Sequence, residues 1–311
     1  MRCCPDLLVR RRLELAGPDS KFIFILRGTI SVIVDCHTHV GEPEHFSKNF
    51  IHDARVASGN PDQQLTVRLP DHWKAMESVD KAIVLGFRAH HVGYVVPNEY
   101  VADYVNQHPE KLVGFCSIDP HDDDGVEQLD HAVLKLGLRG MKLGPIYQNI
   151  HPSDNKIKRL FKRAEQLQVP ILIHQGTTFC CNVSLEVADP ILLQPIALEF
   201  PRLRMVIAHM GHPWIGETIA LIRKHPFLYS DISALYYRPW QFYNALVLAS
   251  EYKVMHKLLL GSDYPMTTPA DTIAGLRKVN DFTPGTMLPK VSEADIEALI
   301  HRETLQLLGI G

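Results

Sequence analysis

The chain has 311 residues, 46% of them hydrophobic, and a formal net charge of -3. This size and composition suit one large α/β domain, and the small charge gives no reason to expect nucleic acid as a partner. Apolar runs stay short of the length that crosses a bilayer, so we expect no membrane partner either. The six cysteines show no C-x-x-C pair and no disulfide-like spacing, which makes a reduced, cytoplasmic compartment the expectation.

The first 31 residues differ in pattern from the rest of the chain. Three consecutive arginines at 10–12 precede an apolar patch at 22–26 that is too short, and too far from the N-terminus, for a signal peptide. We interpret residues 1–31 as an N-terminal extension, either partly disordered or a start-site artefact. The folded domain is expected at 32–311.

Short apolar runs alternate with helical patterns along that domain. Runs of β-branched and aliphatic residues predict eight strands, at 32–39, 81–86, 112–117, 139–143, 170–174, 203–209, 227–232 and 257–263. Apolar spacing and helix-start signals predict helices near 66–79, 97–107, 126–136, 157–167, 189–199, 214–224 and 239–251, and after 268 and 292. The segment 40–65 is expected to be a polar loop, because glycine and proline interrupt it.

Strands that alternate with helices indicate a parallel sheet with crossover helices. The strand count favours closure into a (β/α)8 TIM barrel, a single α/β domain with extra C-terminal helices. The alternative is an open, doubly wound sheet. The first predicted strand is not followed by a G-x-G-x-x-G motif, which weakens a dinucleotide-binding version of that alternative.

Histidine, lysine and aspartate stand at the carboxyl ends of several predicted strands. The first strand ends in His-x-His. Because side chains on a strand alternate, His37 and His39 should point one way, and Cys36 and Thr38 the other. Later strands end in single polar residues: Lys142, His174, His209 and Asp263. In a barrel these ends meet at one mouth, and imidazole and carboxylate are ligands of zinc and similar metals. Each residue alone has an ordinary structural explanation, but their joint placement favours a divalent metal site.

Five segments carry a resemblance to a known family. In chain order they read VDCHTH at 34–39, GMKLGP at 140–145, LIHQG at 172–176, AHMG at 208–211 and LGSDYP at 260–265. With these motifs the chain resembles, from about residue 32 to its end, the amidohydrolase superfamily and specifically its amidohydrolase-related branch. That branch contains metal-dependent hydrolases of esters, lactones and amides. It also contains non-oxidative decarboxylases such as aminocarboxymuconate-semialdehyde decarboxylase.

The resemblance implies a role for each motif residue. It makes metal ligands of four residues: His37, His39, His174 and Asp263. Asp263 would also take a proton from a metal-activated water, and His209 would bind a second metal or polarise the substrate. A lysine at the position of Lys142 is carboxylated and bridges two ions in two-metal members, but it need not be modified in this branch. We therefore expect one ion, zinc with manganese as the alternative, and an unmodified Lys142 near the substrate.

Three functions stay open on these grounds. The leading one is a metal-dependent hydrolase of an ester, lactone or amide, with Asp263 as proton shuttle and His209 as the second catalytic residue. The next is a decarboxylase of an aromatic or muconate-type acid, which calls for a carboxylate-binding arginine such as Arg55, Arg88 or Arg238. The third is an inactive barrel used as a binding protein, which the complete ligand set disfavours. A small molecule is the expected partner, and family analogy predicts a homodimer.

Overall fold

Parallel strands occupy the centre of the structure, in the order in which they follow one another along the chain. The structure is a computed structural model that describes residues 32–311, so the predicted extension at 1–31 lies outside the described residues. The eight strands are β1 (Val34–His39), β2 (Lys81–Leu85), β5 (Leu112–Ser117), β6 (Met141–Leu143), β7 (Ile171–Ile173), β8 (Met205–Ile207), β9 (Leu228–Asp231) and β10 (Leu258–Leu259). Each pairs in parallel with the next.

Hydrogen bonds between the first strand and the chain around the last one close the sheet. The backbone N–H of Cys36 donates to the carbonyl of Leu260, and that of His39 donates to the carbonyl of Tyr264, both at 2.9 Å. Thr38 and Tyr264 form a parallel bridge in the same seam. The TIM barrel predicted from the strand count is therefore confirmed.

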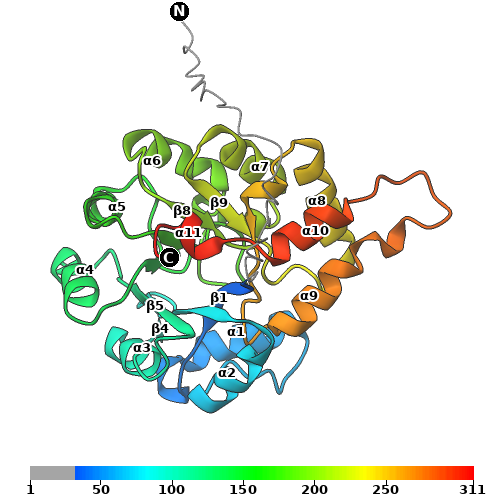
Figure 1. Ribbon diagram of the computed structural model, residues 1–311. Coiled ribbons are helices and arrows are strands. Elements are labelled where there is room, and N and C mark those ends of the chain that lie inside the picture. The colour runs from blue at the N-terminus through cyan, green and yellow to red at the C-terminus, as the bar shows by residue number, and fades with distance from the viewer. Residues whose placement is uncertain (1–31) are drawn as a thin grey trace, which may run out of the picture. The chain divides into compact units, whose positions relative to one another are not determined.

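Helices surround the strands, as Figure 1 shows. They are α1 (Lys48–Ser58), α2 (Leu69–Ala75), α3 (Asn98–Val105), α4 (Gly125–Leu134), α5 (Asn155–Leu167), α6 (Gln194–Glu199), α7 (Ile215–Lys224), α8 (Pro239–Glu251), α9 (Pro269–Arg277), α10 (Glu293–Ile300) and α11 (Thr304–Leu307). In the described range, none of these helices has the length and apolar character that crossing a membrane requires.

Helix α5 illustrates why such segments fold as they do. The side chain of Asp154 accepts a hydrogen bond from the backbone N–H of Lys156 and so caps the first turn. Apolar residues then recur at helical spacing and face the barrel, where they are buried: Ile157, Leu160, Phe161 and Ala164.

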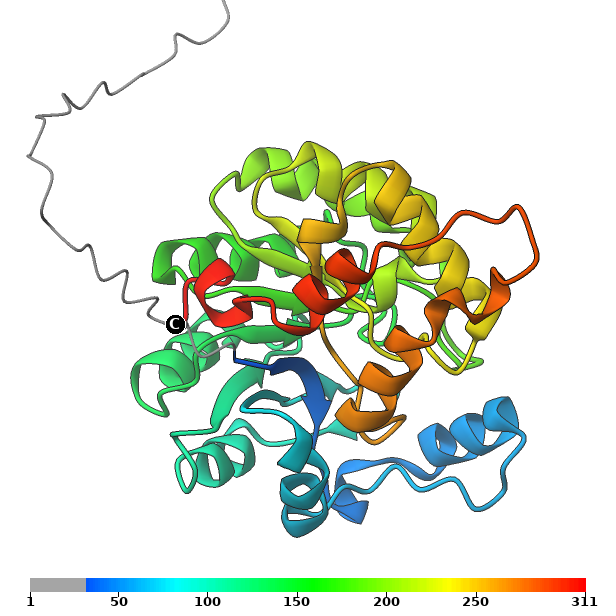
Figure 2. The ribbon, with the colours of Figure 1, turned by 45° about the vertical axis from the view of Figure 1, so that its right-hand side comes forward.

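The prediction of a polar loop at 40–65 is wrong in its middle, where α1 lies. Ser47 accepts a hydrogen bond from the backbone N–H of Phe50 at 3.1 Å, and Gly59 ends the helix with a φ of 63°. The glycine and proline residues flank this helix and do not interrupt it. Phe50 and Ala54, one turn apart, are its buried residues. Figure 2 shows α1 apart from the ring of the other helices.

A short antiparallel hairpin between β2 and α3 is a second element that the sequence pattern does not predict. Its strands are β3 (Arg88–Ala89) and β4 (Tyr94–Val95), which are too short to show a period. The hairpin places the ring of Tyr94 against those of Phe46 and Phe50, with centroids 4.6 and 5.2 Å apart. An aromatic wall therefore forms between α1 and the barrel.

Large apolar side chains from the strands fill the barrel interior. This cluster includes Ile83, Leu85, Val113, Phe115, Leu172, Val206, Tyr229 and Leu259. The C-terminal tail completes it, because Leu308 and Ile310 belong to the same cluster and are 1% and 4% exposed. Gly309 approaches Arg204, which precedes β8, so the tail closes the end of the barrel at which the strands begin.

We expect Leu308→Ala to lower the free energy of unfolding by about 2–5 kcal/mol, because it leaves a cavity in a packed interior. Leu198→Ala is the matched control, since the same change removes a side chain that is 62% exposed and should cost less than about 0.5 kcal/mol. Urea unfolding followed by circular dichroism measures both. Equally small effects would mean that the tail contributes little to the core.

Candidate functional site

A β-bulge shapes the end of β1, which carries the His-x-His pair. Asp35 pairs with Ala82 and Thr38 pairs with Val84, so β1 advances by three residues where β2 advances by two. Bulges re-aim the side chains next to the extra residue. Cys36 packs in the interior cluster, so the strict alternation predicted across 36–39 fails at this position.

Three donor atoms of the predicted site converge beyond the bulge. His37 Nε2 lies 3.2 Å from His39 Nε2 and 3.2 Å from Oδ1 of Asp263, and that oxygen is 3.4 Å from His39 Nε2. The backbone N–H of Asp263 also donates to the carbonyl of His37 at 2.7 Å. Closure of the barrel therefore brings the first and last motifs of the sequence into direct contact.

Asp35 supports the same seam from inside the protein. One of its carboxylate oxygens accepts hydrogen bonds from the backbone N–H groups of His37 and Ser262, each at 3.0 Å. Burial raises the pKa of this carboxyl group to about 7, although the hydrogen bonds lower it. Asp35 thus links His37 to Ser262, the residue that precedes Asp263.

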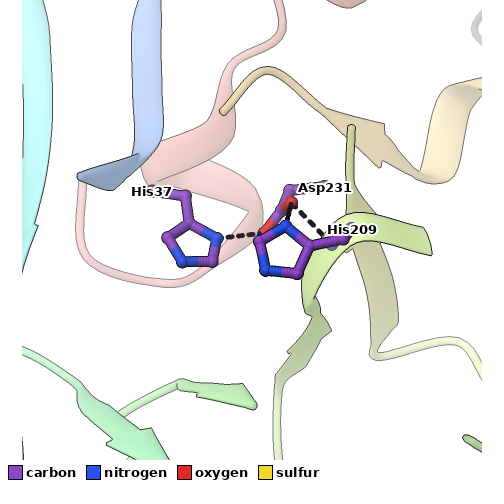
Figure 3. A group of neighbouring side chains, drawn as sticks. All are labelled: His37, His209 and Asp231. Atoms are coloured by element: carbon purple, nitrogen blue, oxygen red, sulfur yellow. Dashed lines mark hydrogen bonds and ion pairs between the residues drawn. The ribbon is translucent and has the colours of Figure 1, made fainter. Parts of the chain in front are cut away.

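Asp231, at the end of β9, connects His37 with His209, as Figure 3 shows. Its Oδ2 accepts a hydrogen bond from His37 Nδ1, and its Oδ1 accepts one from the backbone N–H of His209, both at 2.9 Å. A carboxylate on Nδ1 fixes the Nδ1–H tautomer. The lone pair of His37 Nε2 therefore faces His39 and Asp263.

Ser233 extends this arrangement to the second imidazole. Its hydroxyl group donates to Oδ1 of Asp231, so its oxygen accepts the hydrogen bond from His209 Nδ1 at 2.7 Å. Neither Asp231 nor Ser233 is among the site residues predicted from sequence. The sequence contained one signal for Asp231: it lies near the end of the strand predicted at 227–232, much as Asp263 ends the strand predicted at 257–263.

His174 lies beside the three converging atoms without joining them. Its ring centroid is 5.1 Å from that of His209, which in turn stacks on His37 at 4.9 Å. His174 Nε2 donates to the carbonyl oxygen of Thr177 at 2.9 Å, which leaves Nδ1 as the atom with a lone pair. Within residues 32–311 the compact groups of metal-ligand type are His37–His39–Asp263 and His37–His209–Asp231.

Lys142, on β6, brings a positive charge into the same group. Its Nζ lies 3.1 Å from His37 Nε2, and its side chain is buried. Burial lowers the pKa of Lys142 to about 8, against the opposing effects of Asp263 and Asp231. Lys142 is therefore in direct contact with His37.

Burial keeps the imidazoles of the site neutral. It lowers the pKa of His37, His39 and His209 well below the usual range, and it lowers that of His174 to about 3. A neutral imidazole has one nitrogen with a free lone pair, which is the form that binds a metal ion.

The converging donors fit a divalent cation. At metal–ligand distances of about 2.0–2.2 Å, two ligands of a tetrahedral ion lie roughly 3.4 Å apart, and His37, His39 and Asp263 are spaced by 3.2–3.4 Å. The lone pair of His37 Nε2 and an oxygen of Asp263 lie side by side, so a cation between them would be bound by both. Burial raises the pKa of Asp263 to about 8, so a nearby cation would stabilise its ionised form.

The backbone is strained at two of the site residues. His209 and Asp263 have φ values of 55° and 63°, in the left-handed region that residues other than glycine rarely adopt. Their backbone N–H groups are held by Asp231 and by the carbonyl of His37. Such conformations persist where the surroundings enforce them, and they are concentrated at functional sites.

A cavity of about 730 Å³ opens above these residues. All six predicted site residues line it: His37, His39, Lys142, His174, His209 and Asp263. Much of its wall is aromatic, with Phe50 on α1, Phe46 just before that helix, Tyr94 on β4, and Tyr147 and Phe179 on the loops that follow β6 and β7. The site is therefore a deep pocket with a polar floor and apolar sides.

Only one of the three arginines considered from the sequence lies at the cavity. Arg238 lines it, as does His212, whereas Arg55 and Arg88 do not. The guanidinium group of Arg238 lies 4.6 Å from the centroid of the Tyr237 ring and donates to the carbonyl of Ala234 at 2.6 Å.

A family model described as Amidohydrolase matches residues 34–310, which include every strand of the barrel and every residue of the site. The chain belongs to the amidohydrolase family. Members of this family are metal-dependent, which agrees with the donors at the cavity floor. The chain is also similar to a curated dihydroorotase of Helicobacter pylori strain P12, with 29% identity over 143 residues. This match covers 43% of the chain and only 40% of the dihydroorotase.

Three solved structures share the amidohydrolase fold. An uncharacterised TIM-barrel protein of Bordetella bronchiseptica, Bb4693, is 18% identical, with a TM-score of 0.68 over 89% of this chain and 98% of that one. A probable 2-pyrone-4,6-dicarboxylic acid hydrolase of Acinetobacter baumannii is 15% identical (TM-score 0.63, 89% and 99% covered). A dihydroxybenzoic acid decarboxylase of Polaromonas sp. JS666, with bound manganese, is 13% identical (TM-score 0.61, 90% and 98% covered). At these identities the likeness concerns the fold alone.

We expect Asp231→Asn to weaken metal binding about 10–100-fold, because an amide holds the Nδ1–H of His37 less firmly than a carboxylate. Added zinc or manganese should then stabilise the variant less, by about 1.4 kcal/mol for each tenfold loss of affinity. Calorimetric melting with and without metal measures the difference. Asp189→Asn, at the cap of the 3-10 helix Pro190–Leu193, is the control. If metal raises the melting temperature of Asp231→Asn as much as that of the wild type, this role of Asp231 is contradicted.

Proposed function

We propose that the protein is a metal-dependent hydrolase that acts on a small carbonyl compound, namely an ester, a lactone or an amide. The observation that carries this proposal is the contact of Asp263 with the neutral imidazoles of His37 and His39 at the cavity floor. The side chains of His39 and Asp263 are 13% and 15% exposed, whereas that of His37 is sealed. Asp263 can therefore meet a water molecule and a substrate that enter from the cavity.

We assign one divalent ion to this site, with zinc as the first choice and manganese as the alternative. Its ligands would be His37, His39 and Asp263, whose donor atoms converge, and His174, which would have to bind through Nδ1. When bound, such an ion supplies Lewis acidity, which acidifies water and polarises a carbonyl group. In this proposal Lys142 is an unmodified amine, which remains available for a negatively charged group of the substrate.

Asp263 acts as the proton carrier in this proposal. Its carboxylate accepts a proton as water adds to the substrate carbonyl carbon, and it returns that proton to the leaving oxygen or nitrogen. His209 has a different role. Because its Nδ1–H is held by Ser233, its Nε2 has a lone pair, which suits a proton acceptor or a ligand better than a donor to a substrate oxygen.

The cavity wall indicates what the substrate is like. Aromatic rings favour a flat, partly apolar body, and Arg238 favours an anion, because guanidinium groups bind carboxylates with two hydrogen bonds. The ion pairs of the described residues leave Arg238 without a carboxylate partner. We infer a planar substrate with a carboxylate, bound between this arginine and the metal site.

The same features support decarboxylation of an aromatic or muconate-type acid as a second candidate function. Arg238 would hold the acid, and Asp263 would deliver a proton to the carbon from which CO₂ departs. The structural neighbours include a probable hydrolase and a decarboxylase, so their fold is compatible with both reactions.

The number of ions is a direct test of the metal assignment. We expect about one zinc or manganese per chain, by inductively coupled plasma mass spectrometry of protein purified without chelators. About two ions per chain would contradict the single-ion assignment and indicate a carboxylated Lys142. No ion after incubation with excess metal would overturn the proposed function.

We expect Asp263→Asn to lower turnover by about 10²–10⁴-fold while the fold is kept, because the amide cannot accept a proton. Hydrolysis of a panel of esters, lactones and amides, and CO₂ release from hydroxybenzoates and muconate-type acids, would be measured in parallel. Asp281→Asn, at an exposed position, is the control. Wild-type rates in Asp263→Asn would refute the proton transfer, and CO₂ release without hydrolysis would favour the second function.

A further inference from the structure

Three buried polar side chains lie behind the metal-binding strand, on the side away from the cavity. They are Thr38 on β1, His72 on α2 and Tyr104 on α3, and they are 0%, 0% and 2% exposed. Thr38 stands between His37 and His39 in the sequence. None of the three has a role in the proposed reaction, yet each is joined to the next by a hydrogen bond.

The geometry fixes the direction of these hydrogen bonds. The Thr38 hydroxyl lies 2.7 Å from the carbonyl oxygen of Ile83. A carbonyl oxygen has no hydrogen, so the hydroxyl is the donor in this bond. His72 Nε2, at 2.9 Å, therefore donates to the Thr38 oxygen. His72 Nδ1 is then an acceptor, and it receives the hydroxyl hydrogen of Tyr104 at 2.9 Å, closer than the other acceptor of that hydroxyl, the carbonyl of Leu69 at 3.3 Å. Burial lowers the pKa of His72 to about 3, so His72 is neutral. Its Nε2–H tautomer makes both hydrogen bonds, to Thr38 and from Tyr104.

The bond from Thr38 to Ile83 lies at the bulge in β1. Ile83 lies on β2 between the two residues that pair with Asp35 and Thr38, where the ladder is irregular. A bulge leaves a residue out of the ladder and locally disrupts it. The Thr38 side chain adds a hydrogen bond between β1 and β2 at this irregular position.

His72 also contacts the segment that carries the carboxylate ligand. Its ring meets that of Tyr264 edge to face, with centroids 5.9 Å apart. Tyr264 directly follows Asp263 and accepts the backbone hydrogen bond of His39. One imidazole thus touches both chain segments that supply the converging donor atoms.

We propose that Tyr104, His72 and Thr38 form a brace that holds the β-bulge and thereby aims His37 and His39 at the metal ion. This inference rests on the metal site of the proposed function. His72 is a positioning residue, because it acts on the ligands through Thr38 and does not reach the cavity. The brace runs from two outer helices to the strand, so it ties the geometry of the ligands to the packing of α2 and α3.

Two substitutions of His72 test the brace. His72→Leu removes the donor to Thr38 and the acceptor for Tyr104, so we expect the zinc dissociation constant to rise about tenfold or more. His72→Gln keeps an N–H group near the Nε2 position, so the constant should stay within about threefold of the wild type. Competition between the full chain and a zinc-binding dye measures these constants without reference to turnover.

A pair of tyrosine variants separates positioning from general stability. Tyr104→Phe removes the hydroxyl that donates to His72, and Tyr243→Phe removes a buried hydroxyl that donates to the carbonyl of Pro289 at 2.6 Å, away from the cavity. Both variants should unfold at lower urea concentration. Only Tyr104→Phe should weaken zinc binding, by several-fold.

The outcomes distinguish the brace from the metal site itself. If the zinc dissociation constants of His72→Leu and Tyr104→Phe equal that of the wild type, the brace is refuted. The proposed metal site is not affected by that result. If His72→Leu does not fold, the tyrosine pair decides, and equal weakening by both tyrosine variants would reduce the brace to ordinary core packing. A wild-type protein that binds neither zinc nor manganese would overturn the proposed function and the brace together.

Discussion

The seam between β1 and the chain that follows β10 is the constraint on which the site depends. His37 and His39 are near the start of the domain and Asp263 is near its end, so they meet only when the barrel closes. The bonds of that closure, including those to the Asp35 carboxylate, lie next to the ligand residues. Formation of the candidate metal site and closure of the barrel are therefore one structural event, which joins the strands that are furthest apart in sequence.

The floor of the cavity concentrates groups that are costly to bury. Several imidazoles, an amine and two carboxylates lie in a small volume, and removing them from water opposes folding unless each finds a partner. Hydrogen bonds that the imidazoles donate to Asp231 and Ser233 satisfy part of this requirement, and left-handed backbone at His209 and Asp263 adds further cost. The apolar interior and the C-terminal tail stabilise the other end of the barrel. One end of the barrel is thus packed for stability, and the other end holds the polar groups of the candidate site.

Much of the fold could be predicted from sequence, because short apolar runs and helical spacing are strong local signals. The histidines and Asp263 were also accessible, since each follows a predicted strand. Helix α1 was not, because its buried face contains only two residues and breakers flank it. Asp231 was missed for another reason: its role comes from a partner near the other end of the chain. The position of His174 depends on which way its ring turns, and strand patterns carry no information about that.

Helix α1 has a consequence for how this protein could change. The helix supplies Phe50, Ala54, Ala57 and Ser58 to the cavity wall, but it contributes nothing to the barrel ladder and none of the candidate ligands. Part of the cavity wall and the candidate metal ligands therefore lie on separate stretches of the chain. Substitutions in α1 would therefore change the shape of part of the pocket and leave the candidate ligands in place.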